Sequence, residues 1–190
     1  KEQDHRLLQA ALRLAEPFLS ESPQLVAHVM KHADHRNVRV RWQVAFTLGR
    51  TAAPQRLSAL VKILKRDAAN RWVRSAVQSG LIDDAGRVLY SLSQDKTFRS
   101  EKAGQIVLQS LAEQIGVQDR SGDLLLFIRS FRAIPASEAA VRASLMQGVR
   151  RYSRRIRGLL SQQGVVSNDA LAKIVQRAKE TALDASAELK

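Results

Sequence analysis

The chain has 190 residues, of which 45% are hydrophobic and only 5% aromatic, and it carries a net charge of +13. It contains no Cys, which excludes disulfides, thiolate zinc sites, a Cys nucleophile and covalent haem attachment. No run of about 18 apolar residues occurs, so the sequence predicts no membrane insertion. The polar first residues lack a signal-peptide core, and there is no initiator Met. We therefore expect the chain to be a segment of a larger protein.

The positive charge is concentrated in two blocks. Residues 36–75 hold ten basic side chains and a single acid, Asp67, and residues 136–160 hold six basic side chains against Glu138. Clustering of this kind attracts polyanions, whereas an evenly spread excess does not.

Apolar residues three and four positions apart predict about ten helices and no strand. The first two cover residues 3–16 and 23–33, with Ser20–Pro23 as a connector. Pro23 suits a first helical turn because it needs no backbone N–H there.

The next four helices are predicted at 38–49, 54–66, from Asn70 to about Leu81, and at 84–93. Asn37 and Asn70 stand where an N-cap side chain binds the first free amides, and Gly49 is a plausible stop.

The helix over 38–49 carries two apolar stripes. Val40, Val44 and Leu48 form one, and Trp42 and Phe46 form the other. We expect this helix to be packed on both sides, and we expect Trp72 of the equivalent helix to lie in the core.

Four more helices follow, at 100–115 from Ser100, at 123–133, at 137–162, and from residue 167 or 168 to near the end. We expect residues 1–135 to form one helical array and residues 136–190 a longer helical hairpin that continues it.

The sequence matches itself at an offset of 33 residues. Between 34–48 and 67–81 six positions recur, which are Asp34 and Asp67, Asn37 and Asn70, Val40 and Val73, Arg41 and Arg74, Val44 and Val77, and Leu48 and Leu81. An offset of this size with helical periodicity predicts a stacked helical-repeat array, in which each unit buries its apolar face against its neighbours.

These two segments, DHRNVRVRWQVAFTLG and DAANRWVRSAVQSGL, resemble HEAT repeats. The shared pattern is an Asp in the turn, an Asn cap, then Val-Arg and apolar residues. The resemblance implies an all-α, right-handed α-α superhelix of the ARM/HEAT solenoid type.

A wider stretch, about residues 5–133, is similar to the HEAT region of large bacterial membrane-bound dehydrogenase-like or haem-binding proteins. In that family a β-propeller precedes the repeats and a c-type cytochrome follows them. The resemblance implies a spacer or docking region in an extracytoplasmic protein, periplasmic or membrane-associated. The haem-attachment motif is absent from this sequence, so redox activity and cofactors are not carried over.

Two interpretations of the repeated Asp and Arg positions are open. Arg41 and Arg74 could bind a ligand along the repeat axis, or Asp34 and Asp67 could cap helices or pair with arginines of the adjacent repeat. Equivalent residues recur at regular spacing in a stack, so the second interpretation is favoured.

A second candidate is the arginine ridge at Arg150, Arg151, Arg154, Arg155 and Arg157. Helical spacing places Arg150, Arg154 and Arg157 on one face with the other two beside it. Guanidinium groups can bind phosphate, sulfate or carboxylate bidentately. The alternative is a solvated face that pairs with acids of a neighbouring domain.

A third candidate is the basic block of the repeats. It comprises Arg36, Arg39, Arg50, Arg56, Lys62, Lys65, Arg66 and Arg71. If these residues share one side, they could follow a nucleic-acid backbone in a salt-dependent way. Because Trp42 and Trp72 fall at core positions, we expect no stacking aromatics among them.

The sequence indicates neither a metal site nor catalysis. His28 and His32 have zinc-compatible spacing, but Lys31 beside them opposes a cation, and His35 and Asp34 complete no known ligand pattern. No nucleophile elbow, P-loop or dinucleotide fingerprint occurs.

The sequence therefore favours a non-catalytic scaffold or protein-docking segment whose partners are flanking domains or another protein. The alternative is a basic module that binds nucleic acid or another polyanion. The oligomeric state and the identity of the partner stay open.

Overall fold

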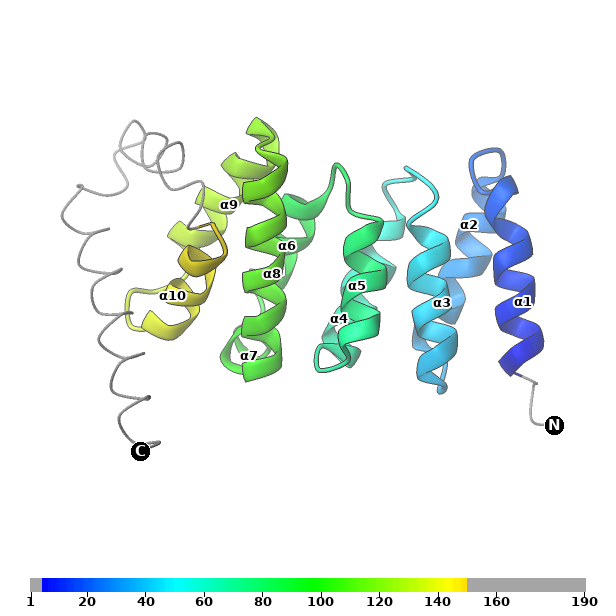
Figure 1. Cartoon of the computed structure of the whole chain (residues 1–190), viewed down its shortest axis with the longest axis horizontal. Helices are drawn as coiled ribbons and strands as arrows, with labels where there is room; N and C mark the ends of the chain where they lie inside the picture. Colours follow the sequence, from blue (N-terminus) through cyan, green and yellow to red (C-terminus); the bar gives the residue numbers. More distant parts are fainter. Residues whose placement is uncertain (1–4, 150–190) are drawn as a thin grey trace. The chain divides into compact units, whose positions relative to one another are not determined.

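A computed structural model describes residues 5–149 of the chain, and all regular secondary structure within that range is helical (Figure 1). The all-α prediction is confirmed for these residues. Two compact units divide the chain at Val88 and Leu89, inside one helix. None of the helices between residues 5 and 149 is long and apolar enough to cross a membrane.

The first unit consists of the following elements: α1 (His5–Ala15), the 3-10 turn η1 (Glu16–Phe18), α2 (Pro23–Met30), the 3-10 turn η2 (Lys31–Asp34), α3 (Val38–Leu48), α4 (Arg56–Asp67), α5 (Arg71–Ser79) and the start of α6 (Ala85–Ser93). The second unit contains the end of α6, then α7 (Lys96–Ser100), α8 (Lys102–Gln118), α9 (Ser121–Ala133) and α10 (Ala139–Gly148).

The helices of the first unit form two layers. In one layer α3 lies between α1 and α5, and in the other α2 contacts α4. Figure 1 shows α1, α3 and α5 side by side with α2 and α4 behind them. Since α3 contacts both α2 and α4, the two layers bury a common core, as the predicted repeat requires.

The helix starts follow the predicted caps. The Asn37 side chain accepts a hydrogen bond from the Arg39 N–H (2.9 Å), and Asn70 accepts one from Trp72 N–H (3.0 Å). Pro23 is the first residue of α2, as predicted. Each Asn satisfies a backbone donor that the first helical turn leaves without a partner.

The predicted stripe of α3 is the core of the first unit. Val40, Val44 and Leu48 are fully buried, as are Val73 and Val77 at the equivalent positions of α5. Burial of each such side chain contributes about 1.5–3 kcal/mol, so this stripe accounts for the stacking of the two repeats.

The prediction that α3 is packed on both sides is wrong for its aromatic stripe. Phe46 is 41% exposed and Trp72 of α5 is 65% exposed, while Trp42 is half-buried. The second layer covers one side of α3, and α1 and α5 flank it. Trp42, Phe46 and Trp72 therefore lie on the outer side of the front layer.

The two neighbours of α3 contact it in different ways. Towards α1, the buried Gln43 and Thr47 share a polar network in which Arg13 donates to Gln43 (2.9 Å) and both Gln43 and Thr47 donate to Glu16 (3.2 and 3.0 Å). Such a network is favourable only when its members are satisfied.

Towards α5, the contact is between backbones. A Cβ on Gly80 would lie 2.4 Å from the Gly49 Cα. Both glycines have ordinary right-handed φ angles, so it is close approach, not conformation, that requires glycine at these positions. Gly49 also ends α3, as predicted.

The second unit contains a helix that the sequence pattern does not predict. The short α7 ends at Ser100, and Glu101, with extended backbone (φ −78°, ψ 140°), separates it from α8. The predicted start at Ser100 is therefore wrong. Gly104 lies so close to the Phe98 carbonyl that a Cβ would be 1.8 Å from its oxygen, and the absence of a side chain allows this sharp turn.

The rest of the second unit packs around α8. Both α9 and α10 contact α8, and Gly148 lies against the Gln109 carbonyl. Of the helix predicted over 137–162, residues 139–148 are helical. Its remainder and the last predicted helix lie outside the described residues. The superhelix and the boundary at residue 135 stay predictions.

Candidate functional site

Arg41 of α3 forms hydrogen bonds both to the end of α4 and to the segment that precedes α3. Its Nε and Nη2 donate to the two carboxylate oxygens of Asp67, both at 2.6 Å, and its Nη1 donates to the backbone carbonyls of His35 (2.5 Å) and Arg36 (3.1 Å). The side chains of Arg41 and Asp67 are only 6% and 9% exposed. The predicted pairing of an Asp with an arginine of the adjacent repeat is confirmed for this pair.

The same guanidinium arrangement recurs in the other unit. Arg99 Nη1 donates to the carbonyls six and five residues before it (3.3 and 3.4 Å), while Nε and Nη2 donate to Glu138 (2.6 and 2.7 Å). Arg74 keeps the first half of the pattern, donating from Nη1 to the Ala68 carbonyl (2.7 Å). The Arg99 bonds hold the pKa of Glu138 below its ordinary value.

A common sequence pattern underlies these arginines. Each lies four residues after the residue at the N-cap position of its helix and directly after a buried apolar side chain. The side chains of Asn37, Asn70 and Asp95 cap their helices, whereas that of Glu138 does not. The four sets are Asn37–Val40–Arg41, Asn70–Val73–Arg74, Asp95–Phe98–Arg99 and Glu138–Val141–Arg142. The fixed offset of 33 reveals only the first two, because the later spacings are irregular.

Arg142, in the last set, has a different environment. Its guanidinium lies 4.3 Å from the centre of the Phe131 ring, and Nη1 donates to the Ile134 carbonyl (3.4 Å). Burial lowers the pKa of Arg142. The aromatic face takes part of the role that a carboxylate has for Arg41 and Arg99.

Asp34 does not follow the pattern of Asp67. It is exposed and forms an ion pair with Lys62 of α4, and its backbone carbonyl accepts from Arg66 (3.1 Å). The residue 33 positions before Arg41 is Leu8, which cannot pair with a carboxylate. The first Asp therefore has no repeat arginine to pair with.

Several residues of the predicted basic block lie at one end of the first unit, which we call the basic edge and define as Arg36, Arg39, Lys65, Arg66 and Arg71. All five are exposed. Arg39 and Arg71 lie in the first turns of α3 and α5, and Lys65 and Arg66 lie in the last turn of α4. The bond from Arg66 to the Asp34 carbonyl joins the end of α4 to η2, the turn that precedes α3.

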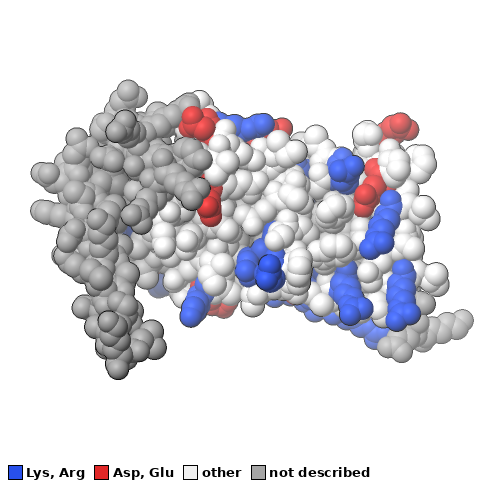
Figure 2. Space-filling view, viewed as in Figure 1, with Lys and Arg blue, Asp and Glu red and all other residues white. Residues whose placement is uncertain are grey.

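The space-filling view shows how these charges are distributed. In the part of Figure 2 that corresponds to α1, α3 and α5, most Lys and Arg lie towards the end where these helices begin. The acidic atoms lie towards the opposite end, where a smaller group of basic atoms is also visible. The N-termini of α3 and α5 add partial positive charge at this end, and the C-terminus of α4 adds partial negative charge, so the net positive charge comes from the side chains. The basic edge therefore favours anionic ligands.

Arg56 does not belong to this surface, contrary to the prediction. It is 4% exposed, and its Nη2 donates to Asp84 (2.8 Å). Burial lowers the pKa of Arg56, and the charge of Asp84 acts in the opposite direction. A basic residue inside an apolar helix face needs an acid from the next element, and Asp84 supplies it.

The arginine ridge at Arg150, Arg151, Arg154, Arg155 and Arg157 lies outside the described residues.

The histidines form no metal cluster. The rings of His28 and His32 meet edge to face with centroids 5.9 Å apart, and the part of the chain from residue 5 to 149 holds no group of three or more His, Asp or Glu side chains suited to a metal. Burial, followed by the charges of His28 and His35, lowers the pKa of His32.

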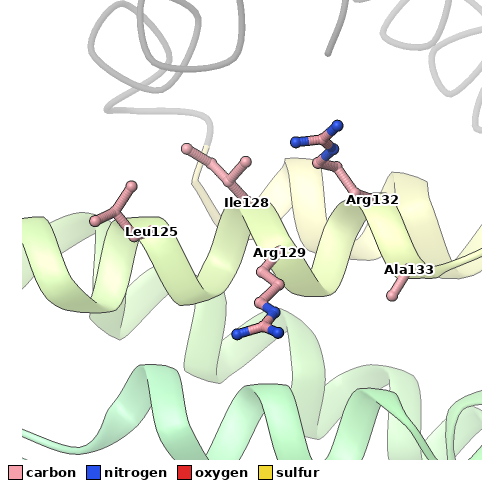
Figure 3. A pocket seen from close by; sticks show the side chains of 5 residues that line it. All are labelled: Leu125, Ile128, Arg129, Arg132 and Ala133. Atoms are coloured by element: carbon pink, nitrogen blue, oxygen red, sulfur yellow. The ribbon is translucent and has the colours of Figure 1, made fainter. Parts of the chain in front are cut away.

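An open hollow of about 530 Å³ lies on α9 of the second unit. Figure 3 shows Leu125, Ile128 and Arg132 directed to one side of the helix and Arg129 and Ala133 to the other. Arg129 lies over the Tyr90 ring, 5.3 Å from its centre. The hollow is lined by two arginines and three apolar side chains. This lining suits contact with another molecular surface better than it suits catalysis.

Comparison with protein-family models, with curated proteins and with solved structures finds no match to this chain.

Proposed function

We propose that this chain is a non-catalytic helical-repeat scaffold of the HEAT solenoid type that docks a protein partner or flanking domains. The observation that carries the proposal is the recurrence of one guanidinium arrangement at Arg41 and Arg99. A buried bidentate pair fixes the orientation of the elements it joins, even where its net energy is small. Four copies of the sequence pattern, three of them with a capping side chain, support a rigid array whose exposed faces are available for contacts.

Cross-linking mass spectrometry on the native protein tests the docking role. Lys31, Lys65 and Lys102 are exposed, so their amines are accessible to a lysine-reactive reagent. We expect reproducible cross-links from these lysines to another protein or to a domain that flanks the helical array. Cross-links confined to the array itself would contradict the proposal.

A second candidate function is binding of a polyanion at the basic edge, and the exposed Arg39 and Arg71 at neighbouring helix starts favour it. Retention on a heparin column at low salt tests it. We expect the Arg39→Ala/Arg71→Ala variant to elute at lower salt. Each lost contact with a phosphate or sulfate group reduces the salt-dependent part of the affinity.

The matched control is Lys102→Ala/Arg132→Ala, which removes the same charge from exposed positions of the other unit. If the wild-type protein is not retained, polyanion binding is excluded. If both variants elute alike, the basic edge is not the binding surface.

A further inference from the structure

Three aromatic side chains lie on the outer side of the front layer of the first unit. Trp42 and Phe46 of α3 stack with ring centroids 6.0 Å apart and an interplanar angle of 25°. Trp72 of α5 is 65% exposed, and the Arg71 guanidinium lies over its ring at 4.9 Å from the centre. These aromatics have faces or edges that solvent reaches.

The repeat relation places these residues on one surface. The offset of 33 makes Trp72 equivalent to Arg39 and Ser75 equivalent to Trp42, and α3 lies directly beside α5. Neighbouring packed helices are about 8–10 Å apart, so Arg39 and Trp72 are lateral neighbours. We call this surface, made of Arg39, Trp42, Phe46, Arg71 and Trp72, the aromatic–arginine surface.

This surface carries positive charge without acids on its own helices. Neither α3 (VRVRWQVAFTL) nor α5 (RWVRSAVQS) contains Asp or Glu, and Arg39 and Arg71 are exposed members of the basic edge. Aromatic rings are therefore interleaved with guanidinium groups and lie next to an anion-attracting edge. Single-strand binding surfaces combine these two elements, rings that stack on bases and cations that follow the backbone.

We propose that the aromatic–arginine surface binds single-stranded nucleic acid, with bases stacked on Trp72 and the Trp42–Phe46 pair and phosphates bound by Arg39 and Arg71. This inference rests on the second candidate function, polyanion binding, and specifies its ligand. A duplex fits less well because its base faces are stacked on one another and cannot reach the rings. An acidic peptide would use the arginines but would offer no base to stack.

Fluorescence titration tests the proposal directly, because the only two Trp residues of the chain, Trp42 and Trp72, both belong to this surface. The probe is a 15-nucleotide oligo(dT) added to the full chain at low salt. We expect quenching of Trp emission on binding. Trp72→Ala should lower the affinity about fivefold or more, since one base–aromatic stack contributes that much.

The matched control is Ser75→Ala, an exposed position on the same face of α5, which should leave the affinity unchanged. Arg39→Gln should reduce the dependence of log affinity on log salt by about 0.7, the value for one phosphate of a single strand. Far-UV circular dichroism checks that each variant is folded.

Comparison ligands separate this inference from the function on which it rests. If heparin binds but oligo(dT) causes no quenching, or if Trp72→Ala binds oligo(dT) as well as wild type does, polyanion binding survives and the single-strand proposal falls. Equal affinity for a 15-base-pair duplex or for poly-Glu would also overturn it. If neither heparin nor oligo(dT) binds, both fail.

Discussion

At the scale of single residues, the arginines of the repeat show how one side chain can fix a local fold. Arg41 satisfies two backbone carbonyls before its own helix and a carboxylate at the end of the next helix. Lys could not do so, because it lacks the planar fork of donors that the two Asp67 oxygens accept. The role of these arginines is therefore to hold the repeats together, in contrast to the exposed arginines of the basic edge.

Substitution of Arg41 tests this structural role. Arg41→Ala leaves Asp67 without its cation in a buried site, and we expect a loss of about 3–5 kcal/mol in the free energy of unfolding. Arg41→Lys should recover little of it. Urea denaturation followed by circular dichroism measures the change.

The matched control is Lys62→Ala, which removes an exposed ion pair with Asp34 and should cost about 0–1 kcal/mol. Equal losses for Arg41→Ala and Lys62→Ala would show that the Arg41 pair is not the constraint we describe.

The Arg99–Glu138 pair gives the second unit an acid-sensitive contact. The hydrogen bonds from Arg99 lower the pKa of Glu138, so the folded state favours the ionised carboxylate. The resulting stabilisation is present above the pKa of an unfolded glutamate, about 4.3, and is lost as the pH falls through the lowered folded value. We expect Glu138→Gln to lower the melting temperature at pH 7, and we expect its difference from wild type to narrow as the pH falls below about 4.3. A difference in melting temperature between Glu138→Gln and wild type that stays constant from pH 7 to pH 3 would contradict this coupling between protonation and stability.

At the scale of elements, most helices follow from periodicity and caps, and the exceptions have local causes. Asn37, Asn70 and Gly49 mark helix ends that the sequence predicts. The helix α7 escapes prediction because it has only 5 residues and Phe98 is its one large apolar side chain, too little for a periodic pattern. The close approach of Gly104 to the Phe98 carbonyl makes the turn after it possible. Exposure of Trp72 could not be predicted either, because an apolar residue at helical spacing does not reveal which side a neighbour covers.

The backbone contact between α3 and α5 gives an element-scale prediction. Gly80→Ala places a methyl group against the Gly49 Cα, and the two helix ends must separate. We expect a loss of about 1–3 kcal/mol and a fall in melting temperature of about 2–4 °C per kcal/mol, measured by calorimetry.

Gly122→Ala is the control, because a Cβ at Gly122 meets nothing within 4 Å. We expect its melting temperature to be unchanged or slightly higher. A neutral Gly80→Ala would mean that the α3–α5 contact is looser than described.

At the scale of the whole molecule, a high net charge coexists with an apolar core in each of the two units. The chain has a net charge of +13, yet within residues 5–88 the buried arginines Arg41 and Arg56 each have an acidic partner. Within residues 5–88 the surplus positive charge is thus carried by side chains that are not buried. The sequence predicts the block at 36–75 but not its division into buried, paired arginines and exposed ones, since only the packing of α3 to α6 assigns these roles.

The core of the first unit should not tolerate a charge at the repeated Val positions. Val44 and Val77 are fully buried, so Val44→Asp or Val77→Asp leaves an unpaired carboxylate in an apolar site, which costs several kcal/mol. We expect loss of the cooperative thermal transition in circular dichroism. Ser75→Asp, on the exposed face of α5, should melt normally, and a normal melt of both Val variants would refute the helix phases.

The two sides of α3 meet their neighbours through different chemistry, with Gln43 and Thr47 towards Glu16 and Gly49 towards Gly80. A tandem duplication of α2 and α3 would place the amide and hydroxyl of the new copy beside a neighbour that has no residue equivalent to Glu16. Both groups would lose the carboxylate oxygen that accepts from them. The modules of this protein are consequently not interchangeable, and its lineage could lengthen the stack only by altering both surfaces of a copied module together.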